Sequence, residues 1–314
     1  MNQLERGAPG WPEYACPVCR TPVVRESSAA YRCPSDGIRY PLVDGIWRFL
    51  PAPQVERHAP FIRAYETVRR AEGRAAKDAA YHRSLPFTPR SDAHHAIWRV
   101  RAQSYRTLLR RVVQPLARAA GKPLRVLDLG AGTGWLAYRL VEAGHHAAAV
   151  DVLTNVWDGL GAWVHFGAEA GYTPVQASFD RLPFIEDECD LIVFNGALHY
   201  SADYEATLRE ALRVLQPHGR IVIMDSPLYR RASSGVRMVE QRNAQFRQDY
   251  GVEVDGLTAE NFLTHDRLKA LGEALRLRWR RLRPYRGTWA LRWGLNRLRM
   301  DREPARFPVI VGHA

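Results

Sequence analysis

The stretch Val126–Trp135 constrains the fold of this chain more than any other segment. Its sequence, VLDLGAGTGW, places an apolar run directly before three glycines at alternate positions, Gly130, Gly132 and Gly134. Glycine has no side chain, so a loop of this composition can turn sharply and bring its backbone close to a ligand. Because a helical pattern follows from Trp135, the segment predicts a buried strand, a ligand-binding loop and a helix.

The same alternation of strand and helix patterns continues toward the C-terminus. Strands are expected at 124–129, 147–152, 190–195, 220–225, 275–282 and 307–311, and helices at 135–143 and 204–215. Strands alternating with helices are typical of a parallel sheet covered on both faces. Residues 275–282 alternate apolar and arginine side chains, which predicts a half-exposed edge strand. The fold class that follows is α/β.

Composition divides the chain into three regions. Residues 1–52, rich in proline and cysteine, predict a small β domain, and residues 53–120 predict a helical linker that also serves as a lid, with Tyr65 and Arg69 over the ligand. Residues 121–314 form the α/β domain, with inserts at 226–256 and 284–306 that shape a second pocket. A chain of 314 residues is long enough for one large domain and a smaller one.

The spacing of the glycines indicates which kind of nucleotide or nucleoside ligand the loop binds. A dinucleotide fingerprint, G-x-G-x-x-G/A, would place its last position on Trp135, where an indole obstructs the packing of helix on strand. The P-loop is excluded because no G-K-[ST] follows. The spacing is instead D-x-G-x-G-x-G from Asp128, and a carboxylate beside the loop suits a cationic ligand better than a diphosphate.

This segment resembles motif I of the class I, Rossmann-like S-adenosylmethionine (SAM)-dependent methyltransferases of the type 11 kind. Asp151 ends the second strand, where nucleoside-binding folds place a carboxylate on the ribose hydroxyls. The segment SFDRLPF at 178–184 resembles the family's D-x-x-x-L-P-F, with Ser178 at the usual acid position and Asp180 as a substitute. RVLQPHG at 213–219 resembles its R-V-L-x-P-G-G turn. The resemblance implies a mostly parallel seven-stranded sheet with an antiparallel C-terminal strand.

The resemblance also implies a SAM site and a place for the methyl acceptor. The residues expected to hold SAM are Asp128, Gly130, Gly132, Gly134, Asp151, Val152, Ser178, Phe179 and Asn195. Methyl transfer needs a general base when the acceptor holds its proton. His199 is the first candidate for a catalytic role, followed by Tyr200 and Asp225, because all three lie at strand ends, where ligands of open α/β sheets gather.

Three cysteines near the N-terminus suggest a metal site. Cys16 and Cys19 form a C-x-x-C knuckle, Cys33 follows fourteen residues later, and Asp36 stands where a fourth cysteine would complete a zinc ribbon. The sequence YPLVDGIWRFL at 40–50 resembles the tail of the Trm112-like family, whose small β domains activate methyltransferases or are fused ahead of them. A structural zinc on Cys16, Cys19, Cys33 and Asp36 is one interpretation, and a domain that folds without metal is the other.

The charge of the chain bears on its partners. Lys and Arg number 45 against 33 Asp and Glu, a net charge of +12, and arginine binds phosphate and carboxylate groups well. A genome that favours arginine codons explains the excess equally well. No apolar run is long enough for a signal peptide or a membrane span, so a cytoplasmic protein is expected.

Three functions are compatible with these features. The leading hypothesis is SAM-dependent methylation of a small molecule, with an anionic metabolite as the favoured acceptor. The second is methylation of rRNA or tRNA bases, which suits the positive charge but lacks an N-P-P-[YF] motif. The third is a non-catalytic SAM-binding module that recruits a partner. The sequence does not predict the oligomeric state.

Overall fold

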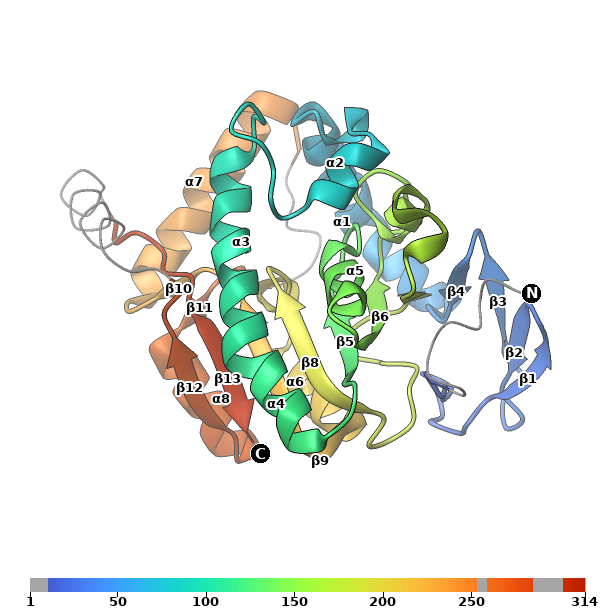
Figure 1. Ribbon diagram of the computed structural model, residues 1–314. Coiled ribbons are helices and arrows are strands. Elements are labelled where there is room, and N and C mark those ends of the chain that lie inside the picture. Colours follow the sequence, from blue (N-terminus) through green and yellow to red (C-terminus); the bar gives the residue numbers. More distant parts are fainter. Residues whose placement is uncertain (1–10, 253–258, 285–301, 314) are drawn as a thin grey trace.

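Strand β5 (Arg125–Leu129) lies at the centre of the main sheet, where a buried apolar run belongs. In the computed structural model, which describes residues 11–252, 259–284 and 302–313, β5 pairs in parallel with two neighbours. These neighbours are β6 (His146–Asp151) and β8 (Cys189–Asn195). The carboxyl ends of the three strands therefore meet at one edge, where the glycine loop begins (Figure 1).

The predicted arrangement of seven strands is confirmed as part of a larger sheet. Its order is β7-β6-β5-β8-β9-β13-β12, with β7 at Thr173–Gln176, β9 at Leu215–Met224, β12 at Arg278–Leu282 and β13 at Val309–His313. Only β13 runs antiparallel to both of its neighbours within this set. β12 is the predicted edge strand, and its three arginines are all exposed.

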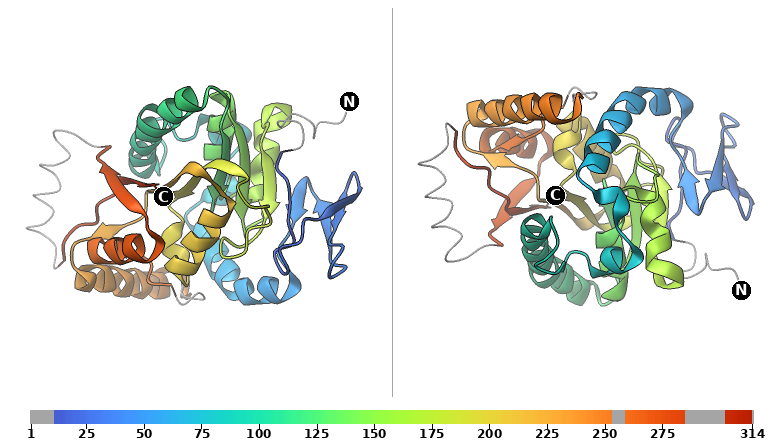
Figure 2. Two further views of the ribbon diagram at one scale, coloured as in Figure 1. Left: turned by 90° about the horizontal axis from the view of Figure 1, so that it is seen from below. Right: turned by 90° about the horizontal axis from the view of Figure 1, so that it is seen from above.

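Helices cover both faces of this sheet, and the side chains of β5 alternate between them. Leu127 and Leu129 pack with helices α6 (Tyr204–Val214) and α8 (His265–Leu275). Val126 points to the other face, where the helices are α5 (Trp135–Glu142), α3 (His95–Leu108), its π-helical extension η2 (Leu109–Val113) and α4 (Gln114–Ala120). Figure 2 shows these two layers on either side of the sheet.

The small β region does not stand apart from the main sheet. Its strands are β1 (Val24–Ser27), β2 (Ala30–Arg32), β3 (Arg39–Val43) and β4 (Ile46–Arg48). β4 pairs in parallel with β7, with Trp47 opposite Val175, so the sheet reaches eleven strands. Tyr14 adds an aromatic contact, with its ring centroid 5.7 Å from that of Phe184. These strands lie at the end of the sheet opposite β12 (Figure 1).

Helices and short segments surround the carboxyl edge of the sheet. From the region before β5 come α1 (Ala52–Ala71), η1 (Arg74–Ala76) and α2 (Ala79–Ser84). From later in the chain come η3 (Leu160–Glu169), η4 (Leu198–Tyr200), β10 (Leu228–Tyr229), α7 (Ala232–Tyr250) and β11 (Leu263–Thr264). Phe61 and Tyr65 of α1 pack with Phe246 and Tyr250 of α7, so these two helices meet above the edge.

The predicted inserts differ in what the structure describes of them. The insert at 226–256 contains β10 and α7. Most of the insert at 284–306, including Trp289, Arg292, Trp293, Arg297 and Arg299, lies outside the described residues.

Two predicted boundaries are corrected. The edge strand begins at Arg278 and not at Leu275, because Leu275 ends α8 and Arg276 turns the chain with a φ of 56°. Asp225 lies just after β9, with a φ of 55°, which is a conformation that aspartate tolerates better than most residues. Within the described ranges, no helix is both long and apolar enough to span a bilayer.

Candidate active site

The loop after β5 has the tight geometry that its glycines predict. The backbone N–H groups of Gly130 and Ala131 donate to the carbonyl of Val150 at 2.8 and 3.1 Å, which fixes the loop against β6. Gly134 begins α5 with a φ of 77°, and a Cβ there would collide with the Tyr172 side chain. A Cβ at Gly130 would likewise meet the Ala197 side chain. Larger residues at these two positions would displace the loop.

A cavity lies between this loop and helix α1, and we refer to it as the loop cavity. Its lining is His58, Phe61, Tyr65, Gly130, Gly132, Asp151, Val152, Leu153, Ser178, Phe179, Gly196, Ala197 and Tyr200. The structure brings together six of the nine residues expected to hold SAM, which are Gly130, Gly132, Asp151, Val152, Ser178 and Phe179. The other three, Asp128, Gly134 and Asn195, do not line the cavity.

Asp151 is the most firmly oriented side chain of the loop cavity. One carboxylate oxygen accepts from the backbone N–H of Gly132 at 2.7 Å, and the other from that of Leu153 at 2.9 Å. Burial raises the pKa of Asp151 to about 6, although these backbone donors oppose the shift. Asp151 also lines the loop cavity, where its remaining acceptor capacity could receive the hydroxyl groups of a ribose.

Asp128 has a different environment from the one predicted. Its side chain is fully buried beneath the loop, close to Tyr172. Burial raises the pKa of Asp128 to about 8, so the carboxyl is mostly protonated at pH 7. It does not provide a negative charge on the cavity wall, and its place under the loop points to a structural contribution.

Ser178, at the position of the family's usual acid, is bound to Asp180. Its hydroxyl donates to Asp180 Oδ1. Asp180 lies outside the loop cavity and lines an adjoining small hollow that also includes Ser178 and Phe179. Ser178, which lines the loop cavity, therefore links that cavity to the Asp180 carboxylate through one hydrogen bond.

A second and larger cavity, of about 880 Å³, opens beside the first. We refer to it as the large cavity. It shares Tyr65, Gly196 and Tyr200 with the loop cavity, so the two spaces adjoin at the end of β8. Aromatic side chains on its wall include Tyr229 and Phe246. A ligand in one cavity can therefore contact a ligand in the other.

All three predicted catalytic residues, His199, Tyr200 and Asp225, line the large cavity. His199 Nδ1 lies 3.1 Å from the hydroxyl of Ser226. Burial, with the positive charges of Arg242 and Arg101, lowers the pKa of His199 to about 3. The imidazole is therefore neutral at pH 7 and only a weak proton acceptor.

Asp225 has one satisfied and one unsatisfied oxygen. The Ser104 hydroxyl, from α3, donates to Oδ1 at 2.6 Å. Oδ2 is buried and has no hydrogen-bond partner among the described residues. Burial raises the pKa of Asp225, while the bond from Ser104 and the positive charge of Arg101 lower it. An unpaired buried carboxylate oxygen is costly, and because Asp225 also lines the large cavity, it is a candidate for contact with a ligand.

Arginine dominates the charged wall of the large cavity. Five arginines line it, against Glu72 and Asp225: Arg69, Arg99, Arg101, Arg242 and Arg302. Arg69 is already bound, because its guanidinium contacts Asp158 at 2.6 and 3.2 Å and so ties α1 to the loop after β6. Arg101 instead stacks on Trp98, with Cζ 4.9 Å from the ring centroid.

The residues that the sequence did not single out come mainly from α1. His58 and Phe61 line the loop cavity together with Tyr65, which was a lid candidate. Their spacing, 58, 61 and 65, places them on one face of a helix. Both ring nitrogens of His58 are buried without a hydrogen-bond partner among the described residues, and burial lowers its pKa. The helical spacing of these three residues was the only signal in the sequence, and it does not reveal what this face of α1 packs against.

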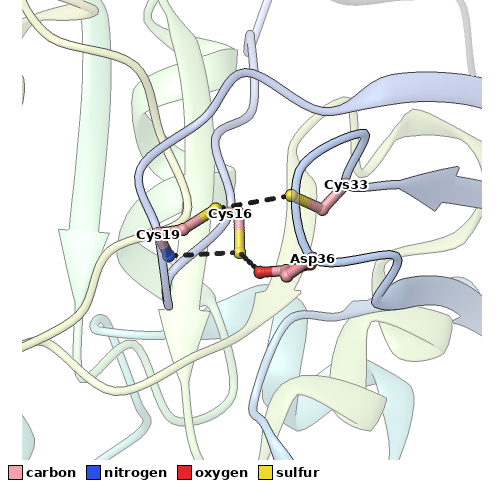
Figure 3. A group of neighbouring side chains, drawn as sticks. All are labelled: Cys16, Cys19, Cys33 and Asp36. Carbon is pink, nitrogen blue, oxygen red and sulfur yellow. Dashed lines mark hydrogen bonds between the residues drawn. The ribbon is translucent and has the colours of Figure 1, made fainter.

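The four predicted metal ligands converge at the base of the small β region (Figure 3). Cys16 Sγ lies 3.0 Å from Asp36 Oδ2, and Cys19 Sγ lies 3.4 Å from Cys33 Sγ. The ligand atoms of all four residues lie within 4.8 Å of one another. The cysteines are free thiols and form no disulfide.

This cluster fits zinc. Tetrahedral coordination with Zn–S bonds of about 2.3 Å separates neighbouring sulfurs by about 3.8 Å, close to the spacing here. The backbone N–H groups of Val18 and Cys19 also donate to Cys16 Sγ at 3.3 and 3.5 Å, and hydrogen bonds to a ligand atom help to orient it for a metal. Tyr40 adds its hydroxyl 3.0 Å from the same sulfur.

Comparison with known proteins supports the family prediction. A family model described as a methyltransferase domain matches residues 127–223. The ubiquinone/menaquinone biosynthesis C-methyltransferase of Vibrio vulnificus is 33% identical over 105 residues, which cover 32% of this chain and 40% of that protein. The demethylmenaquinone methyltransferase of Mycobacterium marinum is 34% identical over 101 residues, covering 32% of this chain and 41% of that protein.

The chain thus spans about two fifths of the length of these curated relatives. Among solved structures, the 1,6-didemethyltoxoflavin-N1-methyltransferase of Burkholderia thailandensis has a TM-score of 0.45 at 17% identity, over 92% of this chain and 97% of that one. The match at 127–223 contains the glycine loop, Asp151 and the end of β8. Residues 127–223 therefore match a methyltransferase domain, in agreement with the prediction from the glycine loop.

Proposed function

We propose that this protein transfers the methyl group of SAM to a small molecule held in the large cavity. The observation that carries the proposal is the pair of adjoining cavities at the end of β8, one beside the glycine loop and one lined by His199, Tyr200 and Asp225. Such an arrangement presents a donor and an acceptor to each other, and positioning accounts for much of the acceleration of a displacement reaction.

The loop cavity has the polar and aromatic groups that a nucleoside needs. Asp151 offers a fixed carboxylate for ribose hydroxyls, and Phe179 offers an aromatic face beside Ser178 for the adenine. His58 carries two unsatisfied ring nitrogens at the same wall, which is the kind of orphaned polar group that a ligand satisfies. When bound, SAM supplies an electrophilic methyl group on a sulfonium.

The role of the protein is then to orient the acceptor and keep water away from the methyl group. Helices α1 and α7 close the site from above through Phe61, Tyr65, Phe246 and Tyr250, which supports the prediction of a lid in region 53–120. The arginines of the large cavity favour an acceptor that carries negative charge. Of the candidate bases we favour Asp225, because burial raises the pKa of its carboxyl group, whereas burial lowers the pKa of His199 to about 3.

We propose further that Cys16, Cys19, Cys33 and Asp36 bind a structural zinc ion. The convergence of four ligand atoms within 4.8 Å supports this assignment. The ion would fix the knuckle that also carries Arg20, whose guanidinium pairs with Glu210 of α6. It would thereby strengthen the contact between the small β region and the methyltransferase domain.

Incubation with radiolabelled SAM and two extracts, one of small metabolites and one of RNA, tests the function. We expect label in the metabolite fraction, with weak dependence on salt, because a cavity excludes most counterions. Label in RNA, with activity that falls steeply as salt rises, would support the base-methylation alternative. Binding of S-adenosylhomocysteine (SAH) with no label in either extract would support a non-catalytic module.

A further inference from the structure

The thiols of Cys19 and Cys33 form a close pair in the small β region. Their Sγ atoms lie 3.4 Å apart, although the residues are 14 positions apart in the sequence (Figure 3). Cys19 is exposed and Cys33 is buried. Cysteines that sense oxidants are typically accessible and lie beside a second thiol. A disulfide bond has a sulfur–sulfur distance of about 2.05 Å, so a small movement of either loop joins these two sulfurs.

Cys16, the third thiol of the cluster, is occupied by other partners. It is buried, and its Sγ lies 3.0 Å from Asp36 Oδ2 and 3.0 Å from the hydroxyl of Tyr40. The backbone N–H of Cys19 also donates to this sulfur, at 3.5 Å. An oxidant that reaches the exposed thiol of Cys19 therefore finds the Cys33 sulfur closer to hand than a sulfur already held by several hydrogen bonds.

The knuckle that carries Cys19 is joined to the methyltransferase domain through the next residue, Arg20. Its guanidinium donates to Glu210 of α6 and, at 3.4 Å, to the carbonyl of Leu182. Glu210 in turn accepts from the backbone N–H of Leu182 at 2.8 Å. Arg213 donates to the same carbonyl of Leu182 at 3.1 Å. Arg20 and Glu210 thus hold both backbone polar groups of Leu182.

Leu182 lies in a segment that reaches the loop cavity. Ser178, four residues earlier, lines that cavity, and its carbonyl accepts from the backbone N–H of Arg181 at 3.2 Å, which closes the segment into a turn. The backbone N–H of Ala15, beside the knuckle, donates to the carbonyl of Pro183 at 3.1 Å. A displacement of the knuckle can therefore reach the loop cavity through a few residues of chain.

We propose that Cys19 and Cys33 are a redox-sensitive pair whose disulfide weakens the binding of SAM. The disulfide draws Cys19 toward Cys33 and displaces the adjacent Arg20 from Glu210, which loosens the segment 178–184. Because the two sulfurs are also proposed zinc ligands, their bond removes two of the four ligands and releases the ion. The effect on affinity rests on the proposed cofactor site, whereas the formation of the disulfide does not.

A peroxide is the oxidant, and the step balances. The sulfur of Cys19 attacks one oxygen of hydrogen peroxide, the O–O bond breaks, and the leaving hydroxide takes up the thiol proton as water, so that Cys19 becomes a sulfenic acid. The sulfur of Cys33 then attacks that of Cys19, the S–O bond breaks, and the leaving hydroxide takes the proton of Cys33. Two electrons pass from the sulfurs to the peroxide. A dithiol reductant reverses the bond by exchange.

Oxidation of the protein as purified tests the proposal. The protein is treated with hydrogen peroxide, non-reduced peptides are mapped by mass spectrometry, released zinc is measured with a chromophoric chelator, and SAH affinity is measured by calorimetry. We expect a disulfide between Cys19 and Cys33, release of zinc, and an SAH affinity about tenfold lower, as for loss of one charge-assisted hydrogen bond. Dithiothreitol with added zinc should restore the affinity. A disulfide between other cysteines, or this disulfide with unchanged SAH affinity, would overturn the proposal.

Variants separate the bond from its effect on the cofactor. Arg20→Gln removes the charged contact with Glu210, so the disulfide should still form, but SAH affinity should be low before oxidation and change less than about twofold on oxidation, because the contact is already lost. Arg25→Gln, at an exposed position of β1 in the same region, is the matched control and should respond as the wild type. Cys189→Ala removes the buried thiol outside the cluster and should also respond as the wild type.

The outcomes distinguish this inference from the proposed function. An equal loss of affinity on oxidation in Arg20→Gln and in the wild type would overturn the route through Arg20. Loss of the response in Cys189→Ala would assign the oxidation to another thiol and overturn the pair. Failure of the reduced wild type to bind SAH would overturn the proposed function itself, whereas SAH binding that is insensitive to the disulfide would overturn only the redox inference.

Discussion

Asp151 Oδ2 accepts a hydrogen bond from the backbone N–H of Gly132 at 2.7 Å, which joins the end of β6 to the glycine loop after β5. Two strands of the sheet thus share the carboxylate that faces the loop cavity. Because the loop and the carboxylate are mutually fixed, the position that we propose for the ribose contact is set before any ligand arrives, and preorganisation of this kind favours binding.

Substitution of Asp151 should weaken cofactor binding. Loss of hydrogen bonds from a charged group costs about 1.5–3 kcal/mol, so Asp151→Ala should lower SAH affinity roughly tenfold to hundredfold. Asp151→Asn keeps the size and one acceptor oxygen, and should have an intermediate effect. Isothermal calorimetry measures both, and unchanged affinity in the alanine variant would remove Asp151 from the site.

The affinity for SAH should depend on pH through the same carboxyl group. Burial raises the pKa of Asp151 to about 6, and hydroxyl donors of the ligand favour the ionised form. The affinity for SAH should therefore be higher at pH 7 than at pH 5. Asp151→Asn should flatten this pH profile. A wild-type profile that matches that of Asp151→Asn would contradict the assignment.

The stability of the free protein should respond with the opposite sign. A carboxyl group whose pKa is raised on folding contributes stability below its unfolded pKa of about 4 and loses it as the pH rises through the folded value. The contribution of Asp151 to stability is therefore lost by about pH 6, and that of Asp128 by about pH 8. Thermal melts of the ligand-free protein between pH 5 and pH 8 should show Tm decreasing, and Asp128→Asn should reduce the slope.

His199 should influence turnover less than Asp225 does. Its neutral imidazole is bound to Ser226 and lies on the cavity wall, which suits a positioning role. With the acceptor found in the extract experiment, His199→Gln should leave SAH affinity within about twofold and reduce kcat by less than Asp225→Asn does, as expected when the base is elsewhere. A larger loss of kcat in His199→Gln would return the role of base to the histidine.

The helix α1 face should be necessary for tight cofactor binding. Phe61 is buried, lines the loop cavity and packs against Tyr65 and Tyr200, with ring centroids 5.5 and 5.7 Å away. Phe61→Ala should weaken SAH binding about tenfold or more, through lost burial of a large side chain. Ile97→Ala, at an exposed position of α3, is the control and should have no effect on affinity.

Zinc should copurify with the protein at about one ion per chain, as four convergent ligands predict. Asp36→Asn should lower the zinc content and the Tm, because a carboxylate ligand is lost. Asp44→Asn, at an exposed position of the same region, should retain both. Elemental analysis decides between the alternatives, and wild-type protein that is free of zinc yet melts like a zinc-loaded sample would favour a region that folds on its apolar core alone.

The parts of the site that could be predicted from the sequence are those formed by residues close together along the chain. The glycine loop and Asp151 follow from strand ends, and the sheet at 121–314 follows from apolar periodicity. His58 and Phe61 could not be found in this way, because they reach the loop cavity through the packing of α1 on distant strands. The unpaired oxygen of Asp225 is likewise visible only once α3 is placed beside β9.

The pairing of β4 with β7 was also beyond prediction from the sequence. Residues 1–52 read as a separate domain because their composition differs, but Trp47 pairs with Val175, far along the chain. Edge strands can accept a partner of either direction, so tertiary contacts decide such a junction. Asp128 shows the reverse case: the motif predicted a charge beside the ligand, whereas burial raises the pKa of Asp128 to about 8 and the residue does not line the loop cavity.

A crystal structure of the protein grown with SAH is the most direct test of the central claim. The account predicts density in the loop cavity, with the ribose hydroxyls on Asp151, the adenine beside Phe179 and the sulfur directed toward Gly196. An empty loop cavity at saturating SAH, or one that binds NAD in its place, would contradict it.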